Sequence, residues 1–111
     1  MAATSERLHE LQKFVEMAPS DPFPLYGLAM EHKSLGNLDE AAEAFERLGR
    51  DHPSYVPQYL LYGKLLAERG QRDRARQVLQ TGIDAAQRGR NLHALGELRG
   101  ELEQLDSAQD D

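Results

Sequence analysis

Apolar residues in this chain recur at three- and four-residue steps, in blocks that end at short polar or glycine-containing breaks. Such a period places the apolar side chains on one face of an α-helix. The first block runs from Ser5 to Ala18 and the last from Leu92 to Leu105. The apolar stripe of the first block comprises Leu8, Leu11, Phe14, Val15 and Ala18. The residues between them predict two pairs of helices, each pair interrupted by a glycine, at Gly36 and at Gly70. We therefore expect six helices.

The breaks between the blocks carry residues that start or stop helices. Gly36 and Gly70 are expected to end a helix in the left-handed conformation that glycine tolerates. Side-chain oxygens near helix starts can accept a hydrogen bond from a free backbone N–H. The expected capping residues are Ser5, Ser20 or Asp21, Asn37 with Glu40 as its capping-box partner, and Ser54. Gly96 and Gly100 lie inside the last helix, where we expect them to allow close packing.

Shifting the chain by 34 residues places residues of the same character on one another. Small residues fall on small ones, large apolar residues on large apolar ones, and turn residues on turn residues. The matches are Pro19 with Pro53, Leu25 with Tyr59, Leu28 with Tyr62, Ala29 with Gly63, Gly36 with Gly70, Ala41 with Ala75, and Phe45 with Leu79. A fixed period of this length predicts stacked helical hairpins.

The repeat resembles that of the tetratricopeptide repeat family, in a short bacterial-type form. The residues that carry the resemblance are Leu25, Leu28-Ala29, Gly36, Ala41, Phe45 and the closing Pro53. The second copy lacks the closing proline, because Gln87 stands in its place. The resemblance implies an all-α fold: a right-handed α-α superhelix, or solenoid, of antiparallel helix hairpins. The alternative is a generic six-helix bundle, in which the matching spacings would be accidental.

The predicted organisation is a single domain over residues 1–106 that begins with half a repeat. Its first block matches the second helix of the repeat, with Arg7 in place of the expected alanine. The predicted parts are a half repeat at 5–18, a first repeat at 22–53, a second at 54–88 and a capping helix at 91–105. Residues 107–111 are expected to form a disordered acidic tail.

Composition and charge narrow the class of protein. The chain has no cysteine, which excludes disulfides, thiolate catalysis and cysteine-bound zinc. A net charge of -6 argues against nucleic-acid binding. The sequence has no apolar run long enough for a membrane span and no signal peptide, so we expect a cytoplasmic location. Basic residues are concentrated between positions 64 and 90, where we expect a solvated face with ion pairs rather than a patch for an acidic partner.

The polar residues show no arrangement typical of catalysis, a metal site or a cofactor site. The histidines lack a second ligand at metal-binding spacing, and His32 lies on an inward stripe, where we expect it to pack. The glycines stand singly at helix ends and form no phosphate-binding loop. Carboxylates occupy outer helix faces, which disfavours a catalytic pair. We therefore expect no enzyme activity, no metal and no cofactor.

The remaining function is protein binding. In the family that the chain resembles, the first helix of each repeat lines a concave groove for a peptide. The first-helix residues outside the core pattern include Phe23, Tyr26, Met30, Lys33, Leu61 and Lys64, and the capping helix adds Asn91. We expect Tyr26, Met30, Lys33, Leu61, Lys64 and Asn91 to bind a protein or peptide partner, with burial of Tyr26, Met30 and Leu61 against neighbouring helices as the alternative.

One branch of the family binds carboxy-terminal tails with a clamp of Lys, Asn and Arg. The matching places hold Tyr26, Met30, Leu61, Asn91 and Leu95. Only Asn91 offers donors for a carboxylate, so this function is disfavoured. The alternative to partner binding is a structural role, a homodimer formed through the groove or an end face. The sequence names neither the partner nor the pathway.

Overall fold

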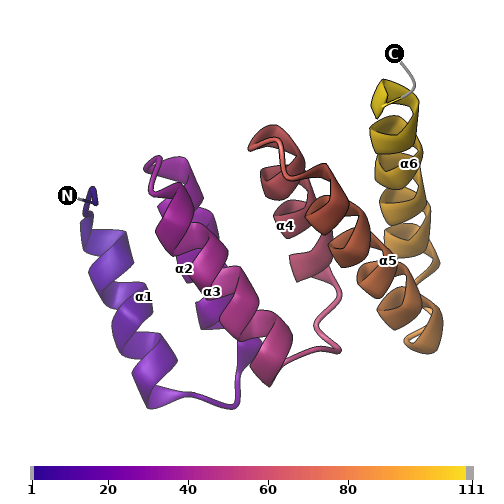
Figure 1. The fold of residues 1–111 in the computed structure, drawn as a ribbon. Coiled ribbons are helices and arrows are strands. Elements are labelled where there is room, and N and C mark those ends of the chain that lie inside the picture. Colours follow the sequence, from indigo (N-terminus) through magenta and orange to yellow (C-terminus); the bar gives the residue numbers. More distant parts are fainter. Residues whose placement is uncertain (1, 110–111) are drawn as a thin grey trace. The chain divides into compact units, whose positions relative to one another are not determined.

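The structure is a computed structural model, and it describes residues 2–109 (Figure 1). Within that range it contains six α-helices and no strand. The helices are α1 (Glu6–Met17), α2 (Pro22–Ser34), α3 (Leu38–Asp51), α4 (Pro57–Glu68), α5 (Arg72–Arg88) and α6 (Leu92–Gln109). The prediction of an all-α chain of six helices is confirmed.

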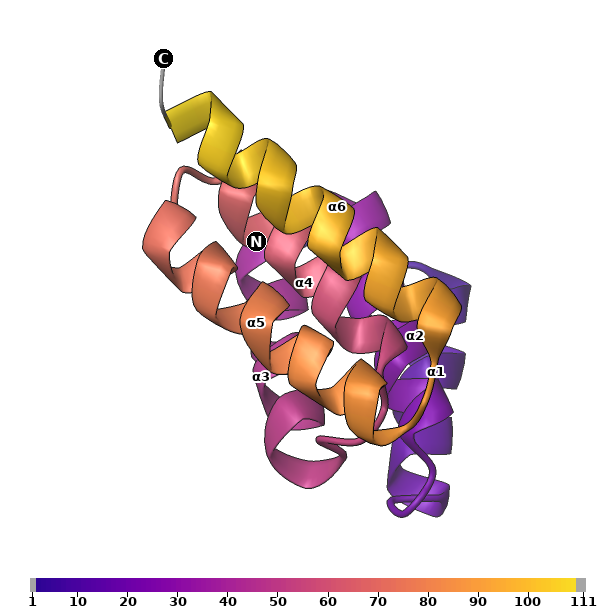
Figure 2. The same ribbon diagram turned by 90° about the vertical axis from the view of Figure 1, so that its right-hand side faces the viewer.

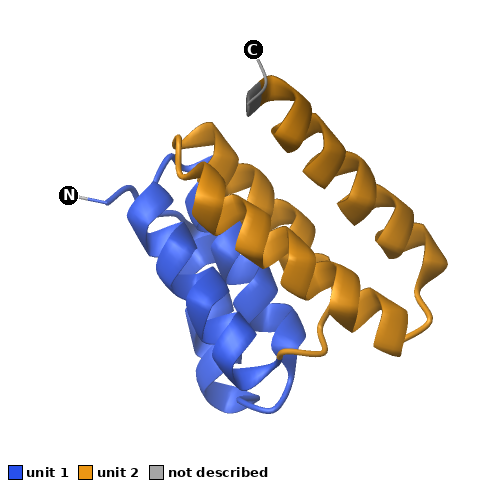
Figure 3. Cartoon of the chain, turned by 45° about the vertical axis from the view of Figure 1, so that its right-hand side comes forward, with its two compact units in different colours: residues 1–52 blue, residues 53–111 orange. Residues whose placement is uncertain are grey.

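The helices divide into two compact units, coloured separately in Figure 3. Unit 1 comprises residues 1–52 and unit 2 residues 53–111. The boundary falls one residue before the predicted change from the first repeat, 22–53, to the second, 54–88. A single domain over residues 1–106 stays a prediction, and each unit is described by itself below.

In unit 1, α2 packs against both α1 and α3. The core is formed by the faces of α2 and α3 that the repeat pattern assigned to the interior. Its fully buried members are Ala29, Ala41, Phe45 and Leu48. From α1, Leu8 and Val15 are buried, whereas Phe14 is exposed although the apolar stripe included it. The stripe therefore predicted the helix correctly and the burial of Phe14 wrongly.

In unit 2, α4 pairs with α5, and α6 runs along both of them (Figure 2). Two glycines bring the backbones close together. A Cβ atom added to Gly63 would lie 2.6 Å from a methyl carbon of Leu79, and one added to Gly82 would lie 2.5 Å from the Cβ of Tyr59. Gly63 and Gly82 therefore allow α4 and α5 to approach closely.

Both hairpins turn at the predicted glycine. Gly36 has φ +79° and Gly70 has φ +80°, which is the left-handed region that L-residues with a Cβ disfavour. The next N–H reaches back to a carbonyl in the preceding helix: Asn37 N–H to His32 O in one turn, and Gln71 N–H to Leu66 O in the other. These contacts satisfy carbonyls that the end of the helix would otherwise leave unpaired.

Two of the predicted caps are confirmed and two are wrong. The Leu8 N–H donates to Ser5 Oγ over 3.1 Å, and the Phe23 N–H donates to Asp21 Oδ1 over 3.0 Å. Ser54 is not a cap, because α4 starts later and its N-cap residue is Val56, followed by Pro57. The N-cap of α3 is Asn37, as predicted, but its side chain makes no capping hydrogen bond.

The last helix differs from its prediction in length and in packing. It continues to Gln109, so residues 107–109 are helical rather than part of a disordered tail, and residues 110–111 of that tail lie outside the described range. Leu98 and Leu105 are buried, whereas Leu92 is exposed. A Cβ atom added at Gly96 or Gly100 would meet nothing within 4 Å, so neither glycine serves close packing.

Candidate partner-binding surfaces

Helix α2 carries an apolar stripe beside its buried face. Phe23, Tyr26, Met30 and Lys33 follow one another at three- and four-residue steps, which places them on one side of the helix. Phe23 is 66% exposed and Met30 43% exposed, while Tyr26 and Lys33 are half-buried. The buried residues of α2 are Leu25, Ala29 and His32, on a different side. Met30 is therefore available to a partner, whereas Tyr26 is partly covered.

The neighbouring helix α1 adds two more exposed apolar side chains, Phe14 and Met17. Of the five large apolar side chains exposed within residues 2–109, four lie on α1 and α2 and the fifth is Leu92. By the 34-residue shift Phe14 corresponds to Leu48, which is fully buried in α3, the partner of α2. Among the described helices only α2 packs closely against α1, and this contact leaves Phe14 exposed.

Helix α4 of unit 2 carries the other predicted groove residues. Leu61 and Lys64 are both half-buried, and Pro57 and Glu68 on the same side are exposed. The core residues of α4 include Tyr59, Tyr62 and Leu66 on the opposite side. Leu61 and Lys64 therefore lie outside the core of unit 2, and their part in binding stays a prediction.

Asn91, the sixth predicted residue, has a local structural role. Its Oδ1 accepts a hydrogen bond from the Ala94 N–H over 3.1 Å, which is the geometry of a cap at the start of α6. The residue is exposed. A partner that used Asn91 would have to share or replace this bond.

Asn37 has a role that the sequence did not suggest. Its side-chain amide bonds both backbone polar groups of Ala3, which precedes α1. The prediction that Asn37 caps α3 is wrong because this tertiary contact uses the side chain instead. No periodicity could reveal the contact, since Asn37 binds the backbone of Ala3 and not its side chain.

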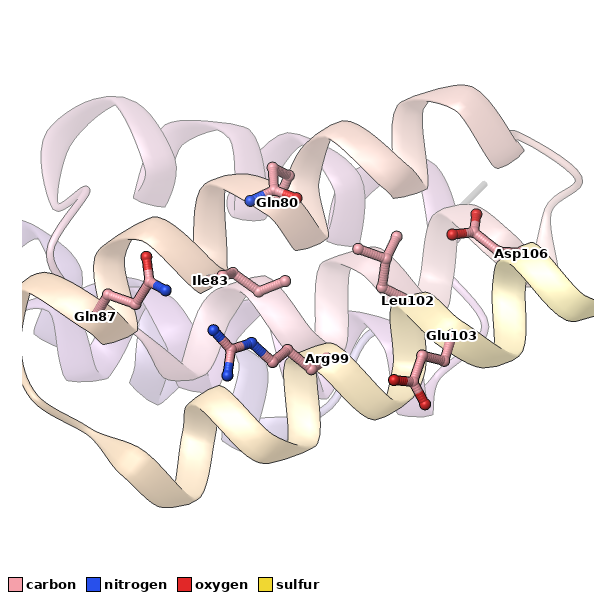
Figure 4. A pocket seen from close by; sticks show the side chains of 7 residues that line it. All are labelled: Gln80, Ile83, Gln87, Arg99, Leu102, Glu103 and Asp106. Carbon is pink, nitrogen blue, oxygen red and sulfur yellow. The ribbon is translucent and has the colours of Figure 1, made fainter.

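A groove between α5 and α6 lies within unit 2 (Figure 4). It has a volume of about 320 Å³. Its lining residues are Gln80, Ile83 and Gln87 from α5, and Arg99, Leu102, Glu103 and Asp106 from α6. Apolar groups from Ile83 and Leu102 lie among charges of both signs, so the groove offers no single-sign site for an anion or a cation. Sequence reasoning assigned no function to this groove.

One arginine of the basic stretch, Arg76 on α5, forms ion pairs with two carboxylates. Arg76 Nε donates to Asp106 Oδ1 over 3.0 Å, and Arg76 Nη1 donates to Asp73 Oδ1 over 3.2 Å. The hydrogen bond with Asp106 is the main cause that raises the pKa of Arg76, and Asp73 adds to it. Arg76 thus fastens α6 to α5.

Tyr59 is the other perturbed group. Its hydroxyl donates to the Pro53 carbonyl over 2.5 Å. Burial raises the pKa of Tyr59 above its ordinary value, and the nearby charge of Arg88 partly opposes this. The side chain packs against Gly82, so this phenol is part of the core of unit 2 and serves no visible chemistry.

His32 is buried and bonds Asn37, which confirms its packing role. In the part of the chain that the structure describes, no three His, Asp or Glu side chains gather in a way that could hold a metal ion. Among residues 2–109 there is also no helix with the length and apolar character needed to cross a bilayer.

Paired helices that repeat along the chain define a helical-repeat protein. The family model described as tetratricopeptide repeat matches residues 9–98. The chain therefore belongs to the tetratricopeptide repeat family. A search of curated proteins found no match.

Solved structures agree with this assignment. A tetratricopeptide repeat domain protein from Salinibacter ruber is 32% identical. Its crystal structure has a TM-score of 0.75, over 78% of this chain and 97% of that chain. The solution NMR structure of a tetratricopeptide repeat domain protein from the same organism has a TM-score of 0.77 at 32% sequence identity. The match covers 80% of this chain and 90% of that chain. The solution structure of a Bordetella parapertussis protein has a TM-score of 0.78 at 21% sequence identity, so it shares the fold. The match covers 95% of this chain and 91% of that chain.

Proposed function

We propose that this protein is a non-catalytic binding module that holds a segment of a protein partner, with α2 as the principal contact helix. Tetratricopeptide repeat proteins generally mediate protein–protein interactions and are generally non-catalytic. The observation that carries the proposal is the exposure of Phe23 and Met30 on the α2 stripe. Flexible methionine and aromatic side chains are common contacts at such surfaces.

The chemistry of the surface sets what the partner brings. Apolar anchors would cover Phe23 and Met30, and an acidic side chain would pair with Lys33. Unit 2 by itself would offer an apolar contact at Leu61, a cationic contact at Lys64 and a polar contact at Asn91. A free carboxy-terminus is not required, because Asn91 alone offers donors among the places of a carboxylate clamp.

The proposal is tested by capture with immobilised protein and quantitative mass spectrometry. The variant Phe23→Ser with Met30→Ser is compared with wild type, because both side chains are exposed and the fold should tolerate the change. The matched control is Leu92→Ser, which removes an exposed apolar side chain from unit 2. We expect the double variant to lose partners that wild type and the control both retain. Equal capture by all three proteins would overturn the role of α2.

The alternative function, a homodimer through an end face, is favoured by Phe14 and Met17 on α1. A second copy that covered them would supply the burial that Leu48 has in α3. Sedimentation velocity over a concentration series tests this. A dimer that dissociates in the Phe14→Ser variant would support the alternative, and a monomer at every concentration would exclude it.

A further inference from the structure

The residues before α1 are bound to the body of unit 1 through their backbone. The Ala3 N–H donates to Asn37 Oδ1 over 2.8 Å, and Asn37 Nδ2 donates to the Ala3 carbonyl over 2.7 Å. One side chain thus satisfies both polar groups of one residue. The pair of hydrogen bonds resembles the pair that two facing residues exchange in an antiparallel β-sheet, with the Asn37 amide in the place of one backbone.

Asn37 is held ready for this contact by its surroundings. It is 7% exposed, and its Nδ2 lies 3.2 Å from Nδ1 of His32, which is 8% exposed. A side-chain amide has two N–H donors and a carbonyl acceptor. With one donor on His32, the second donor and the oxygen are left for a backbone N–H and C=O. Asn37 gives up the capping bond that its position at the start of α3 would allow.

The bound segment contributes little besides its backbone. The side chains of Ala2, Ala3 and Thr4 are all exposed. The next fixed point is Ser5, whose Oγ donates to Glu31 Oε2 over 2.7 Å. Recognition at Ala3 therefore depends on an extended chain with a free N–H, a condition that any residue except proline can meet.

We infer that Asn37, backed by His32, is a binding site for an extended peptide backbone, and that the chain's own N-terminal segment (Ala2–Ser5) occupies it. A partner's extended segment would compete with that segment, which makes the contact autoinhibitory. The site belongs to unit 1 alone, because the positions that match His32 and Asn37 in the second repeat are Leu66 and Gln71. Its residues differ from those of the α2 stripe, so it goes beyond the proposed function.

Two proline variants of the full chain separate the site from its occupant. Ala3→Pro removes the N–H that Asn37 Oδ1 accepts, while the matched control Ala2→Pro keeps both backbone groups of Ala3. The probe is an acetylated, amidated peptide of residues 1–6, added at millimolar concentration. Two-dimensional ¹H–¹⁵N NMR follows the side-chain amide of Asn37.

We expect wild type and Ala2→Pro to show the same amide signals, and Ala3→Pro to shift them. Added peptide should return the signals of Ala3→Pro toward the wild-type positions, with an apparent affinity roughly fivefold to tenfold above that for wild type. This rise in affinity corresponds to the loss of one hydrogen bond of ordinary strength from the competing N-terminal segment. The chain's own N-terminal segment has an advantage over the added peptide because it is covalently tethered to the site. The affinity for the peptide therefore rises only when the contact of the tethered segment is weakened.

A third variant tests the chemistry of the site. Asn37→Asp keeps a good cap residue for α3 and removes the amide donor, so the fold should persist while the peptide no longer binds. Unchanged amide signals in Ala3→Pro would show that the segment does not occupy the site. Shifted signals that the peptide cannot restore would reduce the contact to a structural fastening and overturn the inference. Neither result affects capture through Phe23 and Met30, so the two proposals fail separately.

Discussion

The two complete hairpins, α2–α3 and α4–α5, solve the same packing problem with residues of different size. Where the first hairpin has Leu25 and Leu48, the second has Tyr59 and Gly82 at the matching positions. The larger residue in the first helix accompanies a smaller one in the second, and Tyr59 lies directly against Gly82. At these two positions, a larger residue in the first helix is therefore offset by a smaller one in the second, and cores tolerate such offset changes better than overpacking.

A second pair of matching positions shows no such compensation. Ala29 and Phe45 of the first hairpin correspond to Gly63 and Leu79 of the second. Here both residues become smaller, and the backbone of α4 comes within reach of the Leu79 side chain. Helix spacing thus adjusts where side-chain volume falls. This is why the two copies share a register although few residues are identical.

The largest effect is expected at Phe45, which fills the core of unit 1. Phe45→Ala should lower the free energy of unfolding by about 3–5 kcal/mol, because a buried aromatic side chain leaves a cavity. Thermal and urea unfolding measure it. The matched control is Phe14→Ala on α1, 54% exposed, where the change should stay below about 1 kcal/mol. Equal losses at the two sites would contradict the burial described for unit 1.

The next effect comes from giving the second hairpin a residue of the first. Gly82→Leu should destabilise unit 2 by about 1–3 kcal/mol or more, since a side chain there overlaps Tyr59. Adding Tyr59→Leu completes the pair found in unit 1 and should restore about 1 kcal/mol of that loss. A double-mutant cycle in urea measures the coupling. Purely additive losses would show that pair volume does not govern this contact.

A smaller effect separates the two close glycines. The new Cβ of Gly82→Ala meets the Cβ of Tyr59, which moves only with the backbone, whereas that of Gly63→Ala meets Cδ2 and Cγ of Leu79, which lie farther out along a side chain. We expect both substitutions to be destabilising, and Gly82→Ala to be the more destabilising of the two. The difference should be about 1 kcal/mol, as the gain in helix propensity is the same for both. The reverse order of melting temperatures would refute the assignment of rigid and movable neighbours.

The smallest effect depends on pH. Because burial raises the pKa of Tyr59 in the fold, the neutral phenol stabilises unit 2 at any pH below its unfolded pKa of about 10. That contribution is lost as the pH rises through the higher folded pKa. Unfolding midpoints of wild type and Tyr59→Phe should therefore converge above pH 10. Parallel pH profiles would argue against this role of Tyr59, a residue that unit 1 replaces with Leu25.

The sequence predicted what depends on local pattern and on the repeat. Helix number, the glycine turns and the caps at Ser5 and Asp21 follow from residue type and spacing alone. The exposed Met30 was also placed outside the core in advance. Asn37 was mispredicted because a residue 34 positions earlier captures its side chain, and local rules for capping contain no such competitor.

Other differences have similar causes. The apolar stripe of α6 ends at Leu105, but no proline or glycine follows it in the described residues, so the backbone continues as a helix to Gln109. Phe14 belongs to the apolar stripe of the first helix, but among the described helices only α2 packs closely against α1, and that contact leaves Phe14 exposed. The α5–α6 groove depends on how two helices are spaced, which side-chain periodicity does not specify.

The contact between Asn37 and Ala3 also has a consequence for the order of events during synthesis. Ala3 leaves the ribosome 34 residues before the side chain that binds it. The N-terminal segment is therefore free throughout the time in which α1 and α2 are made, and it is fastened only when the turn after α2 has emerged. Since translation proceeds at roughly 5–20 residues per second, this interval lasts a few seconds. In that interval the nascent segment is open to modifying enzymes and chaperones, and after it the segment is docked.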